Sequence, residues 1–198
     1  MIFVRRYLIY FFIIVVIAFL ETFIAVKVYP NIAFTKNDIW RILPSPGDPN
    51  RDIYTRAGVA AVGTLANKKP EQAYFSTETD IVDEQLSGNC LYKLTGEDIE
   101  ARWWSVTAYG SDGFLIENSE KLYSYNSENI NYNINGGFEI FFLGKNDFIS
   151  EIGNKNWLRV RPNENFSLSL RLYGTNEELF SNLRRVNLPI IEKLRCIE

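Results

Sequence analysis

Histidine is missing from this chain of 198 residues. Its absence excludes Ser-His-Asp and Cys-His catalytic arrangements, histidine-ligated zinc sites and acid-base catalysis by imidazole. Only carboxylate, lysine, tyrosine or serine chemistry remains open to the side chains. We therefore predict no catalytic residue, no bound metal and no cofactor.

Cysteine is scarce, and strong charge of either sign is also lacking. The two cysteines, Cys90 and Cys196, are too far apart in sequence to form a Cys-x-x-Cys redox pair, and a four-cysteine zinc site is impossible. The formal net charge is only -3, and basic residues alternate with acidic ones along the chain. A nucleic-acid partner is not expected, because the phosphate backbone requires a continuous basic surface.

One long apolar segment opens the sequence. No charged residue occurs from Tyr7 to Leu20, and after Glu21 and Thr22 the apolar residues continue. About 20 helical residues at 1.5 Å each cover a hydrocarbon core of about 30 Å, so residues 7–28 are predicted to form a transmembrane helix after a cytoplasmic tail, residues 1–6. A buried core helix and a cleaved signal peptide are the alternatives. The length of the segment and the lack of a small-x-small cleavage site favour an uncleaved anchor.

The orientation of this helix is less clearly encoded, because the basic residues at its two ends nearly balance. The short N-terminal tail and a cysteine pair that could form a bridge outside the cytosol favour a single-pass protein of the bacterial inner membrane with a periplasmic C-terminal domain. Glu21 lies inside the span, where a charge is costly. It either reaches the interface or is protonated, or it contacts another helix.

The remaining chain is predicted to form one domain behind a spacer. Residues 29–48 are rich in proline and are expected to be extended, with Trp40 at the membrane surface. Asp48 and Pro49 have the positions of an N-cap and a first helical residue, which predicts a helix ending near Asn67. The domain is therefore expected to cover residues 49–198.

After Pro70 the apolar pattern changes from a helical period to alternation. Turn residues separate the alternating runs, which favours a mainly β fold, an antiparallel β-sandwich with one or two short helices. Thr175 and Glu178 have capping-box spacing, which predicts the second helix at residues 176–183. The predicted strands cover residues 73–77, 90–94, 102–109, 114–116, 138–143 and 166–173.

Two of these strands have informative faces. In the run 166–173, alternation directs Phe166 and the three leucines to the core, and Arg171 and Tyr173 to the other side. In the run 102–109, both faces carry a large aromatic residue, so this strand is predicted to be central in its sheet.

The sequence also resembles a known family. The motifs that carry the resemblance are Arg102-Trp103-Trp104-Ser105-Val106-Thr107-Ala108-Tyr109-Gly110, Trp157-Leu158 and Phe166-Ser167-Leu168-Ser169-Leu170-Arg171-Leu172-Tyr173. They are similar to the domain of unknown function 1214, in its short bacterial form with a membrane helix ahead of it, over roughly residues 51–196. The resemblance implies a jelly-roll-like sandwich and no established reaction. It also implies a disulfide between Cys90 and Cys196 that ties the C-terminal tail to the sheet.

The candidate binding surface is a polar and aromatic face on the two patterned strands. Flat rings beside hydroxyls and a guanidinium suit a glycan, a lipid headgroup or a peptide carboxylate. The alternatives are an outer sheet surface, or a core edge at which Arg171 pairs with a carboxylate. The candidate ligand-binding residues are Trp103, Ser105, Thr107, Tyr109, Arg171 and Tyr173.

Clustered carboxylates give two weaker hypotheses. Asp80, Asp83 and Glu84 could hold calcium, although an acidic loop explains them as well. Glycosidase chemistry would need two carboxylates at a defined separation, for which Glu100, Asp112 and Glu117 are the candidates.

The sequence thus favours a membrane-anchored envelope protein that is a non-catalytic binding or assembly module. Its expected partners are the membrane, through the N-terminal helix, and another envelope protein, a glycan or a lipid. The alternatives are a periplasmic carboxylate-dependent hydrolase acting on glycans and a transporter accessory subunit that uses Glu21 as its contact.

Overall fold

The computed structural model of the protein describes residues 2–42, 47–62, 71–175 and 177–197. The chain divides into two compact units, which are described separately. The first comprises Met1–Phe34 and Ser45–Lys68, and it contains helices α1 and α2. The second comprises Thr35–Pro44 and Lys69–Glu198, and it contains every strand in the described part of the chain.

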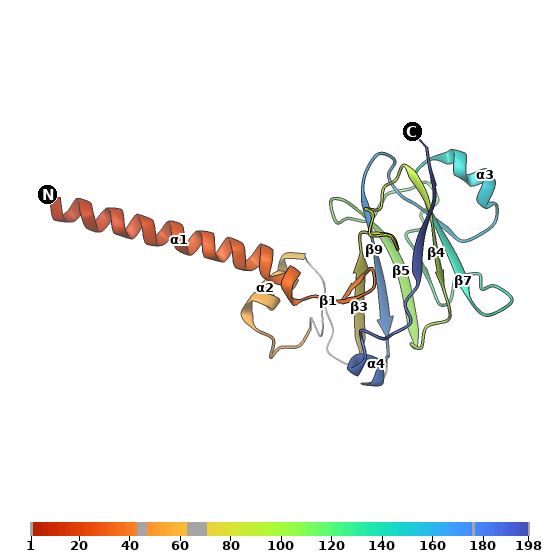
Figure 1. Ribbon diagram of the computed structural model, residues 1–198, viewed down its shortest axis with the longest axis horizontal. Helices are drawn as coiled ribbons and strands as arrows, with labels where there is room; N and C mark the ends of the chain where they lie inside the picture. Colours follow the sequence, from red (N-terminus) through yellow and green to blue (C-terminus); the bar gives the residue numbers. More distant parts are fainter. Residues whose placement is uncertain (1, 43–46, 63–70, 176, 198) are drawn as a thin grey trace. The chain divides into compact units, whose positions relative to one another are not determined.

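Helix α1, Ile2–Ala33, contains the apolar segment (Figure 1). Its stretch Phe3–Val26 has a mean hydropathy of 2.7 and the length of a membrane span, and none of it is buried. The helix begins before Tyr7 and ends after Val28, so it is longer than the predicted span 7–28. The reason is that backbone hydrogen bonding continues the helix beyond the apolar side chains on which the prediction rested.

Helix α2, Ile53–Val62, starts later than predicted. Asp52 is its N-cap: the Asp52 carboxylate accepts hydrogen bonds from the backbone N–H groups of Tyr54 (3.1 Å) and Thr55 (2.9 Å) and from the Thr55 hydroxyl (2.7 Å). These bonds lower the pKa of the Asp52 carboxyl, with the Thr55 hydroxyl as the largest cause. Asp48, the predicted N-cap, instead accepts a bond from Asn50 N–H within the preceding turn. The predicted end near Asn67 lies outside the described residues.

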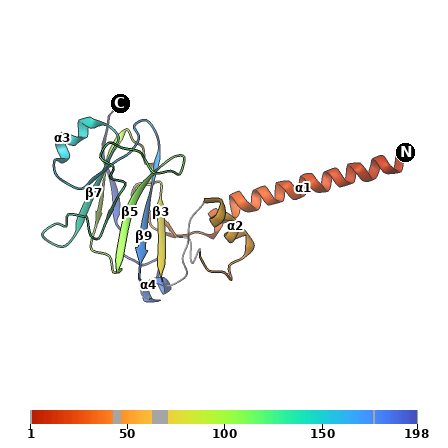
Figure 2. The same ribbon diagram turned by 180° about the vertical axis from the view of Figure 1, so that it is seen from behind.

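In the described part of the second unit, ten strands form two sheets. The six-stranded sheet has the order β1-β2-β3-β9-β5-β6, and the four-stranded sheet has the order β10-β4-β7-β8. Figures 1 and 2 show the two layers from opposite sides. The strands are β1 Thr35–Asn37, β2 Trp40–Ile42, β3 Gln72–Thr77, β4 Cys90–Gly96, β5 Trp103–Gly110, β6 Ser124–Asn126, β7 Phe138–Leu143, β8 Trp157–Arg159, β9 Phe166–Tyr173 and β10 Ile190–Cys196.

The predicted mainly β, two-sheet fold is confirmed, with three differences in detail. Strand β8 runs parallel to β7, so the smaller sheet is mixed and not purely antiparallel. Residues 114–116 form no strand; Leu115 makes a single bridge to Tyr109. The predicted second helix is shorter, α4 Glu177–Ser181, and a short η1–α3 segment, Asn146–Phe148 and Ile149–Ile152, was not predicted. In the sandwich, α3 and α4 lie at opposite ends (Figure 1).

The prediction that residues 29–48 form an extended spacer is corrected by the structure. Within it, β1 and β2 form a hairpin, and β2 pairs with β3 at the edge of the large sheet. Trp40 is 1% exposed, and its indole N–H donates to the Pro189 carbonyl over 2.8 Å, so it is a core residue and not a membrane-surface residue. The domain boundary therefore differs from the predicted residue 49. Three-residue strands are too short to show alternation, and the prolines around them concealed them.

The main core lies between the two sheets. From β9 it receives Phe166, Leu168, Leu170 and Leu172, all at most 2% exposed, as the alternation predicted. Strand β5 lies between β9 and β6, which confirms its predicted central position, and it contributes the fully buried Trp104. Trp104 stacks on Phe138 of β7 with ring centroids 4.6 Å apart. A second, smaller cluster around Phe141, Leu143 and Phe148 is on the outer side of β7, under α3.

Candidate ligand-binding face

The structure brings all six candidate residues onto one face of the six-stranded sheet. Strands β5 and β9 pair antiparallel, with Trp103 opposite Tyr173, Ser105 opposite Arg171, and Thr107 opposite Ser169. Side chains of paired residues point to the same side of a sheet, and this side is opposite to the leucine face. Figure 2 shows β3, β9 and β5 side by side.

Strand β3 adds residues that the sequence did not indicate. It pairs with β9 on the side away from β5, which places Tyr74 opposite Arg171 and Ser76 opposite Ser169. The alternation of β3 alone separates Tyr74 from the buried Phe75, but the neighbour of β3 could not be identified from that pattern. We call the resulting surface the Arg171 face; it consists of Tyr74, Trp103, Ser105, Thr107, Tyr109, Arg171 and Tyr173.

Arg171 is the central charged group of this face. Its guanidinium donates a hydrogen bond to the Tyr109 hydroxyl, and its carbon lies 5.8 Å from the centroid of the Tyr109 ring. The Nε atom is buried and has no hydrogen-bond partner among the described residues. No carboxylate of the described residues lies within ion-pair distance of Arg171, so the alternative in which this arginine pairs with a carboxylate does not hold there.

The candidate residues differ in their accessibility. Trp103, Tyr109, Arg171 and Tyr173 are partly exposed, whereas Ser105 and Thr107 are only 4% and 5% exposed. Trp103 and Tyr173 pack edge to face with centroids 5.2 Å apart. A ligand on this face would therefore contact the rings and the guanidinium, and the two hydroxyls would lie beneath them.

A disulfide joins Cys90 and Cys196, as the resemblance implied. The two residues are directly opposite each other in the pairing of β4 with β10. Next to the bridge, Ile197 N–H donates to the Asn89 carbonyl over 3.0 Å, and the Lys145 ammonium donates to the Ile197 carbonyl over 2.9 Å. The bridge thus fastens the last strand to the first strand of the smaller sheet.

The sequence profile of a family described as Protein of unknown function (DUF1214) matches residues 71–177, more than half of the chain. The chain belongs to the DUF1214 family. This match is shorter than the expected 51–196, and it leaves out β1, β2 and β10, although the structure includes them in the sandwich. No curated protein matches the sequence.

Two solved structures are similar to this DUF1214 chain. The VPA0106 protein from Vibrio parahaemolyticus matches with a TM-score of 0.60 and 19% identity, over 74% of this chain and 36% of that protein. A putative uncharacterized protein from Burkholderia cenocepacia matches with a TM-score of 0.47 and 17% identity, over 89% of this chain and 40% of that protein. The first likeness shows the fold alone, and the chain spans well under half the length of either protein.

The carboxylates considered for hydrolysis have surroundings typical of surface residues in this DUF1214 domain. Asp112 binds Arg161 over 2.7 Å, and this hydrogen bond is the largest cause of the lowered pKa of the Asp112 carboxyl. A general acid needs the opposite shift, because it must stay protonated near neutral pH. Glu100 and Glu117 are exposed residues outside the strands.

The acidic loop proposed for calcium is held by its own backbone. Asp80 is fully buried, and its Oδ1 accepts hydrogen bonds from the backbone N–H groups of Val82 (3.1 Å) and Glu84 (3.0 Å). The Asp83 carboxylate accepts from Thr79, and the Glu84 carboxylate pairs with Lys193. Within the described residues no group of three or more acidic, cysteine or histidine side chains could hold a metal ion.

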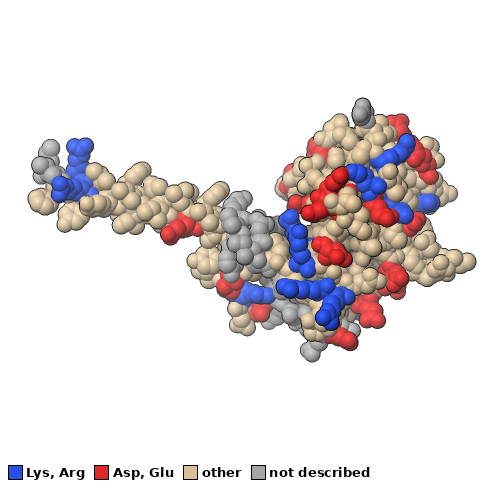
Figure 3. Space-filling model, in the orientation of Figure 1, with Lys and Arg blue, Asp and Glu red and all other residues tan. Residues whose placement is uncertain are grey.

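Elsewhere on the sandwich, opposite charges are mixed. Lys93 of β4 lies 3.7 Å from Glu139 and 3.5 Å from Glu192 on the neighbouring strands. Figure 3 shows basic and acidic side chains interspersed over the visible surface of the domain. Arg159 binds Glu120 through two nitrogens, each 3.2 Å from a carboxylate oxygen, and this pairing lowers the pKa of Glu120 to about 2.

Proposed function

We propose that this DUF1214 protein is a non-catalytic binding module held at a membrane by α1, and that the Arg171 face recognises an anionic group of its ligand. The observation that carries the proposal is the state of Arg171: a partly enclosed guanidinium without a carboxylate partner among the described residues. Arg159, Arg161 and Arg195 of this domain each bind a carboxylate, whereas Arg171 does not and has a buried Nε without a partner among the described residues.

The chemistry of the face supports an anionic ligand group. A guanidinium cannot lose its charge in a protein, and burial without a counter-ion removes hydration that a ligand anion would replace. The Nε–H has no partner among the described residues, and the Tyr109 hydroxyl beside the guanidinium can donate as well as accept. Carboxylate and phosphate both fit this arrangement, and the rings of Trp103 and Tyr173 offer a flat surface to the rest of the ligand.

The membrane tether is supported by the composition of α1. The 24 residues Phe3–Val26 would extend about 36 Å as a helix, against a hydrocarbon core of about 30 Å. The disulfide supports the periplasmic side of a bacterial inner membrane for the sandwich, since such bridges persist in oxidising compartments. Retention of full-length protein in alkali-washed membranes, with both cysteines resistant to alkylation until reduced, is the expected result. Release of the protein in soluble form with free thiols would contradict this placement.

The binding proposal is tested on the full chain extracted in a mild detergent. Native mass spectrometry should detect a bound anionic species whose occupancy falls at least about tenfold in R171Q, because a charge-assisted hydrogen bond is worth about 1.5–3 kcal/mol. The accurate mass and fragments of the adduct distinguish a phosphate-bearing lipid from a carboxylate-bearing ligand.

The matched control is R195Q: Arg195 lies in β10 of the smaller sheet, and its guanidinium forms an exposed ion pair with Glu151 of α3. R195Q should keep the adduct, and Y109F should weaken it, because the Tyr109 hydroxyl lies beside the guanidinium. An adduct retained equally in R171Q and R195Q would refute the proposal. So would a preparation of the unmodified chain that carries no anionic adduct.

A further inference from the structure

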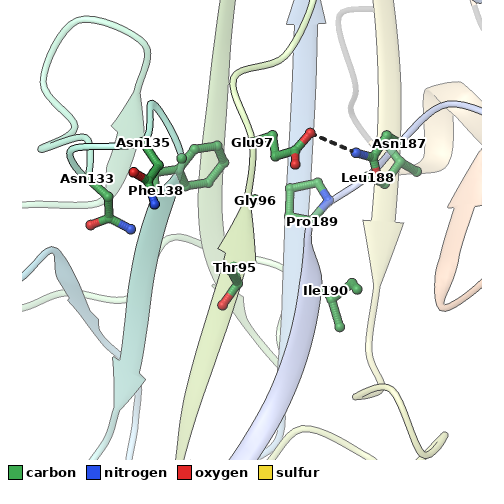
Figure 4. Close-up of a pocket in the computed structure, with 11 residues that line it drawn as sticks. Thr95, Gly96, Glu97, Asn133, Asn135, Phe138, Asn187, Leu188, Pro189 and Ile190 are labelled. Atoms are coloured by element: carbon green, nitrogen blue, oxygen red, sulfur yellow. Dashed lines mark hydrogen bonds between the residues drawn. The ribbon is translucent and has the colours of Figure 1, made fainter.

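A cleft of about 380 Å³ lies at the end of the smaller sheet, and none of the residues that line it belongs to the Arg171 face. It is situated where β4 ends and where β7 and β10 begin, and Figure 4 shows its lining. The turn that carries Asn133 and Asn135 forms one side, and the segment from Asn187 to Ile190 forms the other. Neither the family nor the sequence motifs point to this place.

The walls of the cleft are fixed by the fold. In the turn, Asn133 N–H donates to the Gly137 carbonyl over 2.6 Å, and Gly136 N–H donates to the Asn133 carbonyl over 2.9 Å. Gly136 has a φ of +79°, a conformation that favours glycine. On the floor, a Cβ on Gly96 would lie 2.6 Å from the Phe138 ring, so only glycine fits there. The cleft is therefore preformed.

Several polar side chains of the cleft have donors or acceptors that no described residue occupies. The side-chain amides of Asn133 and Asn135 are exposed and make no hydrogen bond to any described residue. Across the cleft, the Asn187 amide donates to one Glu97 oxygen over 3.3 Å (Figure 4), which leaves the other Glu97 oxygen and the Asn187 carbonyl as acceptors. The Thr95 hydroxyl is also exposed. Three amides, one hydroxyl and one carboxylate thus border a single opening.

We propose that this cleft binds a neutral sugar residue of a glycan. Amides and hydroxyls donate and accept at the same time, as sugar hydroxyls do, so the two sets of groups can satisfy each other. The exposed side chain of Ile190 offers apolar surface to the C–H groups of the ring.

Other ligand classes match the lining less well. Among the described residues no lysine or arginine lines the cleft, so none of them offers an anion a charged partner there. Strand β4 on the floor is paired with β7 and with β10, so it offers no open edge to which a peptide strand could add. An acyl chain would bury the amides without hydrogen bonds, which is unfavourable.

The test uses the full chain in a detergent that has no sugar headgroup, since a glycosidic detergent would compete for the site. Cellotriose, maltotriose and chitotriose are titrated separately, and binding is measured by saturation-transfer NMR and calorimetry. At least one trisaccharide is expected to bind, and the N133A/N135A variant should bind it at least about tenfold more weakly, because two hydrogen-bonding groups are lost. N187A should also weaken it.

The matched control is N154A, because Asn154 is exposed, lies in a turn outside the cleft and makes no side-chain hydrogen bond to a described residue. N154A and R171Q should bind the sugar as the unmodified chain does, so failure here is distinguishable from failure of the Arg171 proposal. Absence of binding to all three sugars at roughly 10 mM, a concentration at which even millimolar affinities are visible, would overturn the proposal. Equal affinities of N133A/N135A and N154A would also overturn it.

Discussion

The disulfide offers the most quantitative test of this structure. Replacing Cys90 and Cys196 by serine removes a cross-link between residues 106 positions apart. In the chain-entropy model, a loop of that length loses about 16 cal/mol/K of unfolded-state entropy on closure, which corresponds to about 4.8 kcal/mol at 298 K. Measured losses are usually smaller, so the free energy of unfolding should fall by about 2–4 kcal/mol.

The structure explains why the bridge matters at this position. Of the seven residues of β10, only Ile191 is buried, so most of the strand contributes little apolar burial. A bulge between Lys193 and Arg195 also interrupts its pairing with β4. Without the bridge, the strand should open from its C-terminal end, and the backbone amides after Glu192 should exchange with deuterium faster than those of β9.

Tryptophan fluorescence is a suitable probe of this unfolding. All four tryptophans lie in the sandwich unit, and Trp104 is fully buried, so the signal does not depend on α1. With a urea m-value of about 2 kcal/mol/M, the loss corresponds to a shift of the midpoint by about 1–2 M. Reductant should lower the urea midpoint of the unmodified chain by a similar amount and leave the midpoint of the double serine variant unchanged. Coincident midpoints for the two proteins under oxidising conditions would refute the reasoning.

Three further predictions use the same urea assay. W40A should lower the free energy of unfolding by about 3–5 kcal/mol, because the indole is buried and its N–H binds Pro189; a loss below about 1 kcal/mol would contradict a core position. E120Q should cost about 0.2–1 kcal/mol at pH 7, since the ion pair with Arg159 is partly exposed. Because pairing lowers the pKa of Glu120 from 4.5 to about 2, the loss of stability caused by E120Q should be complete above about pH 4.5 and should vanish as the pH falls towards 2. A loss of stability that increases on acidification would contradict this ion pair. D80A should cost about 1–3 kcal/mol because two backbone N–H groups lose their acceptor, whereas a chelator should leave the midpoint unchanged, and a chelator-induced decrease would restore the calcium hypothesis.

Long, regular patterns were predicted well from the sequence. The apolar segment gave the helix α1, although not its limits, and the leucine alternation of β9 gave the inner face of the large sheet. Aromatic residues on both sides of β5 correctly placed that strand between two others. These features were accessible because each depends on the side chains of one continuous segment.

Short elements were not predictable in the same way. Strands β1, β2, β6 and β8 contain three residues each, too few to display alternation, and their conformation depends on the strands that they pair with. The largely exposed β10 carries no apolar pattern, and its place beside β4 is set by backbone pairing and the disulfide. The N-cap of α2 is Asp52 and not the predicted Asp48. Both residues have side chains that can cap a helix, and only the folded chain selects between them.

By itself, the sequence determined the apolar character of α1, the β-rich nature of the rest and the set of side chains that could share the Arg171 face, because hydrophobicity and side-chain direction are local properties. Only the tertiary structure decided that Trp40 is a core residue, that the described neighbour bound by the Arg171 guanidinium is Tyr109, and that Asn187 borders the same cleft as the distant Asn133 and Asn135. Those outcomes depend on which strands become neighbours. Strand pairing depends on how segments far apart in the sequence fit each other, so no single segment of the chain encodes it.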